Sequence, residues 1–198
     1  MESVKRHPNL FNKNDSALLV VDYQERFVKV LPDNKNTIEN IKFLIHGFNI
    51  YNVPVFVSEQ VPEKLGHTVQ DIKDVVRDAF LFSKKPMSCC GNVEFLGELK
   101  KKNIKQIAVC GIEAHVCVQQ TTLDLLWHGF QVHVISDAIT SRVLHNKGIG
   151  IEKMRSAGAI ISSVETVLFE MAYEAGNEEF KKLQQLFKND TRQMMRDA

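Results

Sequence analysis

Three residues of this chain carry side chains that could do chemistry together. Asp22, Lys84 and Cys117 each follow a short apolar run, and in each case the run has the character of a buried strand. A carboxylate beside a thiol can take the thiol proton and later deliver it to a leaving group, and a nearby ammonium keeps the carboxylate ionised and stabilises the thiolate. Together the three residues predict nucleophilic catalysis by a thiol, provided that the fold brings them to one place.

Cys117 lies at the start of a predicted helix over residues 116–128, after the predicted strand 106–110. At a strand-to-helix junction, the amide groups of the first helical turn favour a thiolate and can hold a developing oxyanion. Cys117 could instead be a small buried residue that fills space under the helix. Asp22 likewise has an alternative role, as a carboxylate that caps a turn after a strand.

The elements that must position these residues alternate along the chain. Continuous apolar runs predict strands buried on both faces, and recurrences at helical spacing predict helices. The predicted strands are 17–21, 55–58, 79–82, 106–110, 131–135 and 159–161. The first predicted helix starts at residue 36 or 37, and the others cover 93–102, 116–128, 146–157, 163–175 and 178–188. Ser162 and Glu165 have the spacing of a capping box, residues 59–71 are expected to form a loop, and Asp137 is expected to end the fifth strand.

This order predicts an α/β fold, a three-layer α/β/α sandwich around a six-stranded, mostly parallel sheet. Ligands of such folds bind outside the carboxyl ends of the strands near a topological switch point, where Asp22, Lys84 and Cys117 would meet. With 198 residues, the chain fits one domain, 1–198, with an N-terminal extension over 1–14 and a polar tail over 191–198.

The composition of the chain indicates which partners it can bind and in which compartment it is found. Lys plus Arg number 25 against 24 for Asp plus Glu, so no nucleic-acid partner is expected. The first residues lack the apolar region of a signal peptide, and no apolar run reaches the length of a membrane span. The four cysteines have no regular spacing, which suits a reducing interior, and a cytoplasmic location is expected.

The sequence resembles the isochorismatase-like hydrolases, also called cysteine hydrolases, and within them the isochorismatase domain-containing group. The resemblance extends from about residue 14 to the C-terminal helix. Its motifs are Leu19-Val20-Val21-Asp22-Tyr23-Gln24 with Phe27, Lys84 four residues before Ser88, Gly111-Ile112-Glu113-Ala114-His115-Val116-Cys117-Val118 followed by Thr121 and Asp124, and Arg155-Ser156-Ala157-Gly158-Ala159.

The resemblance implies a Rossmann-like fold and a triad in which Asp22 is the general base and acid, Lys84 the electrostatic partner and Cys117 the nucleophile. It implies a cis peptide bond between Ile112 and Glu113, with the amide groups of this turn and of Cys117 forming an oxyanion hole. The implied reaction is hydrolysis of a small amide, carbamoyl or related substrate through a thioester. A catalytically inactive relative that serves as an interaction or small-molecule-binding protein is the alternative, and family members usually assemble as dimers or larger homo-oligomers.

Four residues are expected at the substrate pocket: Gln24, Phe27, Glu59 and His115. Gln24 and Phe27 would support the loop that carries the aspartate and form the pocket wall, and His115 could line the pocket or donate to a carbonyl. Arg142 is either a carboxylate anchor or a solvated loop arginine.

No metal and no other cofactor are expected. Nicotinamidase relatives bind a metal through an Asp-x-His motif after the second strand, whereas this chain has Ser58-Glu59-Gln60 there and His67 as the only histidine of the following loop. One imidazole does not make a metal site.

Overall fold

The sheet of this protein has six strands in the order β3-β2-β1-β4-β5-β6, and every neighbouring pair is parallel. The structure is a computed structural model that describes residues 5–190, so the predicted polar tail over 191–198 lies outside the described residues. The strands are β1 (Ser16–Val21), β2 (Val55–Gln60), β3 (Phe80–Lys84), β4 (Gln106–Ile112), β5 (Gln131–Thr140) and β6 (Ile160–Ser162). The chain order reverses between β1 and β4, which makes their carboxyl ends the topological switch point.

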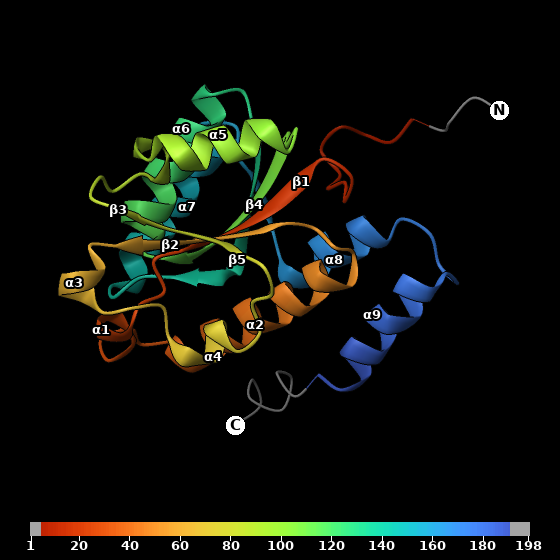
Figure 1. The fold of residues 1–198 in the computed structure, drawn as a ribbon, viewed down its shortest axis with the longest axis horizontal. Coiled ribbons are helices and arrows are strands. Elements are labelled where there is room, and N and C mark those ends of the chain that lie inside the picture. The colour runs from red at the N-terminus through yellow and green to blue at the C-terminus, as the bar shows by residue number, and fades with distance from the viewer. Residues whose placement is uncertain (1–4, 191–198) are drawn as a thin grey trace.

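Helices cover both faces of the sheet (Figure 1). Helices α2, α4, α8 and α9 lie on one side, and α5, α6 and α7 on the other. The helices are α1 (Glu25–Val28), α2 (Asn34–Ile50), α3 (Pro62–Leu65), α4 (Gln70–Lys73), α5 (Val93–Lys101), α6 (Gln119–Trp127), α7 (Leu144–Ser156), α8 (Val164–Ala172) and α9 (Glu178–Lys188), with a 3-10 turn η1 (Cys89–Gly91) and a π turn η2 (Ala114–Val118). The predicted three-layer fold is confirmed.

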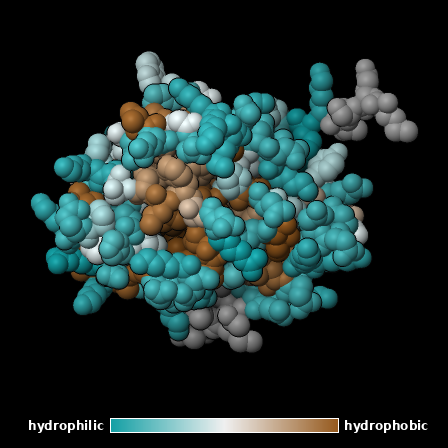
Figure 2. All heavy atoms as spheres, in the orientation of Figure 1, coloured by the Kyte–Doolittle hydropathy of each residue, from teal (hydrophilic) through white to brown (hydrophobic). Residues whose placement is uncertain are grey.

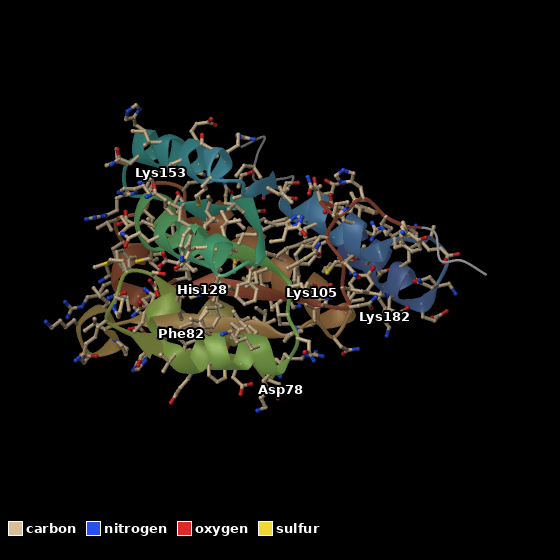
Figure 3. All side chains as sticks on the ribbon, turned by 90° about the horizontal axis from the view of Figure 1, so that it is seen from above. Asp78, Phe82, Lys105, His128, Lys153 and Lys182 are labelled. Atoms are coloured by element: carbon tan, nitrogen blue, oxygen red, sulfur yellow. The ribbon has the colours of Figure 1, made fainter. Side chains whose placement is uncertain are left out.

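Strand β1 is buried along its whole length, which explains its unbroken apolar sequence. Leu18 and Val20 face the core under α2, and Leu19 and Val21 face the core under α5 and α6. In the second core, Phe82 of β3 lies against α5 and stacks on Phe95, with 4.7 Å between ring centroids (Figure 3).

Residues 6–11, which precede β1, pack against the core. Phe11 is fully buried, and its ring lies 5.7 Å from that of Phe48 and 5.0 Å from that of His133, between centroids. Arg6 donates from Nη2 to the carbonyl of Glu170 at 3.0 Å, which fixes the start of the segment on the C-terminal end of α8.

Five of the six strands are longer than the sequence predicted: β1 by one residue at its start, and β2 to β5 at their carboxyl ends. β2 continues through Glu59 and Gln60, where a loop was expected, and β3 includes Lys84. β5 continues past Asp137 to Thr140, because the β4–β5 register shifts between Val109 and Gly111 and lets β5 bulge before it pairs again. Polar residues at the ends of strands predict a loop from the sequence, but in this structure hydrogen bonds hold them in the sheet.

Two helix starts also differ from prediction. The N-cap of α8 is Ser163, whose Oγ accepts from the N–H of Thr166 at 3.2 Å, so the capping box predicted at Ser162 and Glu165 is wrong by one residue. The predicted single helix from residue 116 begins instead as the π turn η2 and becomes α-helical only at Gln119. The turn that carries the thiol therefore has its own geometry.

Hydrophilic side chains cover most of the face seen in Figure 2, with an apolar area near its middle. Within residues 5–190, the helices are all too short or too polar to cross a membrane.

Candidate active site

Asp22 sits where β1 ends, in a left-handed backbone conformation with φ 48°. Its N–H donates to the carbonyl oxygen of Ser58 at 3.1 Å, and the Ser58 hydroxyl donates to Asp22 Oδ1 at 2.7 Å. A left-handed conformation is costly for a residue other than glycine, and these bonds to β2 oppose that cost. One carboxylate oxygen is thus fixed, and the other is left for a second partner.

Lys84 is that partner. Its Nζ donates to Asp22 Oδ2 at 2.7 Å, to Gln60 Oε1 at 2.6 Å and to the Met87 carbonyl at 2.9 Å. Burial alone would lower the pKa of Lys84, but the Asp22 carboxylate outweighs it and the pKa is raised. The ammonium therefore stays charged and donates its three N–H groups to fixed acceptors. This suits an electrostatic role rather than proton transfer to a substrate.

Cys117 lies in the π turn η2 and is 8% exposed. Burial raises the pKa of its thiol, the charge of Asp22 and a hydrogen bond to it raise that pKa further, and the charge of Lys84 lowers it. The outcome is a raised pKa, so the resting group is a thiol and not the thiolate that the sequence position suggested. A thiol beside a carboxylate can still act as a nucleophile when it passes its proton to that carboxylate during attack.

The turn before the thiol brings β4 close to β1. Gly111 has φ 108°, and a Cβ there would collide with the backbone of Val21. The peptide bond between Ile112 and Glu113 is cis, at the position that the family resemblance implied. Ile112, Glu113 and Cys117 lie along this one turn, so the oxyanion hole predicted from them stays a prediction that the backbone path allows.

Glu113 binds Arg142. Its Oε1 accepts from the backbone N–H of Arg142 at 3.0 Å and from Nε at 3.0 Å. Burial alone would raise the pKa of Glu113, but the Arg142 hydrogen bonds outweigh it and the pKa is lowered. The guanidinium is more than half exposed, and within residues 5–190 no acceptor binds its two terminal nitrogens.

A cavity of about 260 Å³ opens beside these residues. Its lining joins the reactive groups to an apolar wall and to one exposed cation: Asp22, Phe27, Gln60, Leu65, Met87, Ile112, Glu113, Val116, Cys117 and Arg142. The triad residues predicted from the sequence are therefore together, with Lys84 behind Asp22 and the thiol at the cavity.

Of the four residues expected at the pocket, Phe27 lines this cavity. Gln24 is fully buried and forms a clamp instead: its Oε1 accepts from the Gln60 N–H at 2.8 Å and its Nε2 donates to the Gln60 carbonyl at 3.1 Å. It therefore holds the end of β2, and with it Gln60, in place.

The other two expected pocket residues are also bound to protein. Glu59 accepts from the N–H of Thr68 at 2.7 Å, and its other oxygen lies 3.0 Å from His67 Nδ1. His115 Nδ1 lies 3.0 Å from the Ser141 hydroxyl. Neither Glu59 nor His115 belongs to the lining of the cavity.

Three residues that contribute to the site were not identified from the sequence: Ser58, Gln60 and Met87. Ser58 and Gln60 alternate along the end of β2, so they share one side of the strand, and the strand runs beside Asp22. That alternation could have identified both, had β2 been predicted to its true end. Met87 lies in the loop before Ser88, and no local pattern distinguishes it from its neighbours there.

The residues present do not gather into a metal site in the part of the chain that the structure describes: it contains no group of three His, Cys, Asp or Glu side chains placed to share an ion. At the position of the metal motif of nicotinamidase relatives, Ser58 and Gln60 are bound to Asp22 and Lys84.

Comparisons with known proteins agree with this geometry. The family model described as isochorismatase domain matches residues 16–166. Isochorismatase family protein 1A of Dictyostelium discoideum is 37% identical over 175 residues, which cover 86% of this chain and 84% of the relative. The secreted isochorismatase effector Isc1 of Phytophthora sojae is 38% identical over 179 residues, covering 88% and 85%.

Solved structures share the fold. The MAR1 ribonuclease of Caenorhabditis elegans superposes with a TM-score of 0.86 at 34% identity, covering 91% of this chain and 93% of that one. The YcaC gene product of Escherichia coli, described as an octameric hydrolase of unknown specificity, has a TM-score of 0.85 at 22% identity and covers 98% of each chain. With the parallel sheet and the family match together, this chain belongs to the isochorismatase family of hydrolases.

Proposed function

We propose that this protein is a metal-independent cysteine hydrolase that cleaves the C–N bond of a small amide, carbamoyl or related substrate. The observation that carries the proposal is that Asp22, which is ion-paired with Lys84 at 2.7 Å, and the thiol of Cys117 line the same cavity. The three groups supply a base, a fixed positive charge and a nucleophile, which is the set that acyl transfer requires.

The reaction has two halves. Asp22 takes the proton of Cys117 as the sulfur forms a bond to the carbonyl carbon, and the carbonyl oxygen becomes an oxyanion held by amide groups of the cis turn. The C–N bond then breaks, Asp22 returns the proton to the departing amine, and a thioester remains. Asp22 next takes a proton from water, the hydroxide attacks the thioester, and the acid leaves as the thiol regains its proton.

The raised pKa of Cys117 fits this sequence of steps. A thiolate that was already stable would not need Asp22, whereas a protonated thiol needs a base within reach. Lys84 keeps its charge throughout, so it offsets the negative charge that Asp22 carries before it takes the thiol proton and again after it returns that proton to the departing amine.

The cavity supports a substrate that carries an anionic group. Glu113 orients Arg142 through Nε and leaves the terminal nitrogens open at the cavity, where a carboxylate could bind both. The rest of the wall, Phe27, Leu65 and Val116, is apolar and offers few partners to a polar chain. We therefore infer a small amide or carbamoyl compound that carries a carboxylate.

A relative at 34% identity is described as a ribonuclease. We do not carry that activity to this chain, because RNA-binding grooves are lined with several basic side chains and stacking aromatics. Here Arg142 is the exposed cation among the lining residues, and the cavity measures about 260 Å³.

The test is a screen of primary amides, carbamoyl compounds and imides, each as a matched pair with and without a carboxylate, with an RNA substrate in parallel. We expect turnover of amides, preference for the carboxylate member, and a Cys117 peptide heavier by the acyl group after acid quench. Hydrolysis of RNA that survives in Cys117→Ala, with no amide turnover in the wild type, would contradict the proposal.

Assembly and location belong to the same proposal. We infer a homo-oligomer, and support comes from the YcaC relative described as octameric, although at 22% identity that likeness shows only the fold. A cytoplasmic location stays a prediction, since one relative is described as secreted. Light scattering behind a sizing column tests the first, and fractionation tests the second.

A further inference from the structure

Met87 lies over the reactive thiol. Its Sδ is 3.9 Å from Cys117 Sγ, the contact at which the thiol donates to the thioether. The Met87 side chain is 45% exposed while the thiol beneath it is 8% exposed, and both line the same cavity. An apolar side chain in this position stands between solvent and the nucleophile.

Hydrogen bonds fix the backbone of Met87, whereas its side chain has, among the described residues, only the hydrogen bond with the thiol to hold it. The Met87 carbonyl accepts from Lys84 Nζ at 2.9 Å, and the Pro86 carbonyl lies 3.3 Å from the same Nζ. These bonds tie the main chain to the buried ion pair. A methionine side chain is unbranched and has three rotatable bonds, so it can move over the sulfur while its main chain stays in place.

Attack by the sulfur leaves only one direction for the acyl group of the substrate. In the proposed reaction, when the carbonyl carbon becomes tetrahedral, the oxygen points to the amides of the turn before Cys117 and the leaving nitrogen lies near Asp22. The remaining substituent must pass the space next to the sulfur that the Met87 thioether contacts. The size of that substituent then depends on how far Met87 can withdraw.

We propose that Met87 is a specificity-determining residue that restricts access to Cys117 and limits the size of the acyl group of the substrate. This inference rests on the proposed cysteine-hydrolase function, whose substrate class it narrows. It is separable from that function, because access to a thiol can be measured without turnover.

The experiment compares alkylation of Cys117 by iodoacetamide and by N-benzyliodoacetamide, which share a leaving group and differ in bulk. Rates are read from the Cys117 peptide in the wild type, Met87→Ala and Met87→Leu. We expect the ratio of small-reagent to bulky-reagent rates to fall about tenfold in Met87→Ala, the discrimination that a methylene or two supplies in an apolar pocket. Met87→Leu keeps the volume and should keep the ratio.

An unchanged ratio in Met87→Ala would overturn the proposal, and so would equal falls in both variants. Because Met87 is half exposed, neither change should unfold the protein, and thermal melts of both variants check this. Once an amide is turned over, kcat/KM for acyl groups longer by one and two methylenes should rise in Met87→Ala relative to the shortest. A lowered alkylation ratio without any amide turnover would support the role of Met87 and contradict the hydrolase.

Discussion

Lys84 Nζ and Asp22 Oδ2 lie 2.7 Å apart in an ion pair whose side chains are 0% and 1% exposed. Two charges are rarely placed so far from water unless each is satisfied, and here Ser58 binds the other carboxylate oxygen while Gln60 and Met87 bind the ammonium. The pair is therefore a preformed part of the site, held by β1, β2 and β3 together.

Removing the ammonium should damage the fold as well as the reaction. Lys84→Met leaves the Asp22 carboxylate buried without its partner, and we expect a loss of about 3–5 kcal/mol in the free energy of unfolding. Lys85→Met, at the exposed neighbouring position, should change it by less than about 0.5 kcal/mol. Urea titrations of both variants measure the difference, and equal losses would show that the ion pair does not stabilise the fold.

Asp22→Asn should make the Cys117 thiol more reactive towards an alkylating reagent and should lower the turnover of amides. The Asp22 charge helps to raise the pKa of Cys117, and Lys84 lowers it, so removing the negative charge should lower that pKa. The pH profile of iodoacetamide alkylation should then move to lower pH, with several-fold faster labelling at pH 7. Amide turnover should fall, because the base is gone.

The matched variant for this experiment is Asp124→Asn, which removes an exposed carboxylate from the helix that follows Cys117. Its alkylation profile should equal that of the wild type. A profile of Asp22→Asn that moves to higher pH would mean that Asp22 does not act on the thiol by charge.

Much of this site could be predicted from the sequence, because strands buried on both faces have continuous apolar sequences. Such runs locate the ends of β1 and β4, and with them Asp22 and the turn that carries Cys117. Lys84 follows from its place after the third run and from the family motif, although it proves to be the last residue of β3 rather than a residue beyond it.

The parts that the sequence did not reveal depend on contacts between distant segments. Glu59 and Gln60 look like loop because they are polar, and they stay in β2 because Gln24 and Thr68 satisfy them. The pKa of Cys117 depends on burial and on the charges around it, and no local pattern records either. Met87 reaches the thiol through a turn whose path the sequence does not specify.

Two glycines of α7 test how the thiol-bearing turn is supported. A Cβ at Gly150 would lie 2.8 Å from the Ala114 carbonyl oxygen and 2.9 Å from His115 Cα, so Gly150→Ala should push α7 against η2. We expect a loss of about 1–3 kcal/mol in stability and a lower kcat. A Cβ at Gly148 would meet no atom within 4 Å, and Gly148→Ala should stabilise the protein by about 0.5–1 kcal/mol.

Thermal melts and kcat of both alanine variants check this prediction. If Gly150→Ala proves as stable and as active as Gly148→Ala, the close contact between α7 and the thiol-bearing turn has no part in positioning Cys117.

His133 should make stability depend on pH. Both ring nitrogens are buried without a partner among the described residues, and burial lowers the pKa of His133 from 6.5 to about 4. Between these values the unfolded chain binds a proton that the folded chain does not, so the stability is full above pH 6.5 and is lost as the pH falls towards 4. At about 1.4 kcal/mol per pKa unit, His133 would cost roughly 3 kcal/mol at pH 4.

The measurement is the free energy of unfolding from urea titrations between pH 4 and pH 8. His133→Leu should flatten the acidic part of the curve, whereas His128→Leu, at an exposed position, should leave it in place. Curves of equal slope in the wild type and His133→Leu would assign the acid sensitivity to other groups.

The central claim is that Cys117 is the nucleophile of a C–N hydrolase, and its most direct test is kcat/KM of wild type and Cys117→Ala for the amide that the screen identifies. The account predicts a fall of at least about a thousandfold, as for loss of other covalent nucleophiles. Cys90→Ala, which removes a half-buried thiol outside the lining of the cavity, should keep kcat/KM at the wild-type value. Turnover by Cys117→Ala within tenfold of the wild type would contradict the claim.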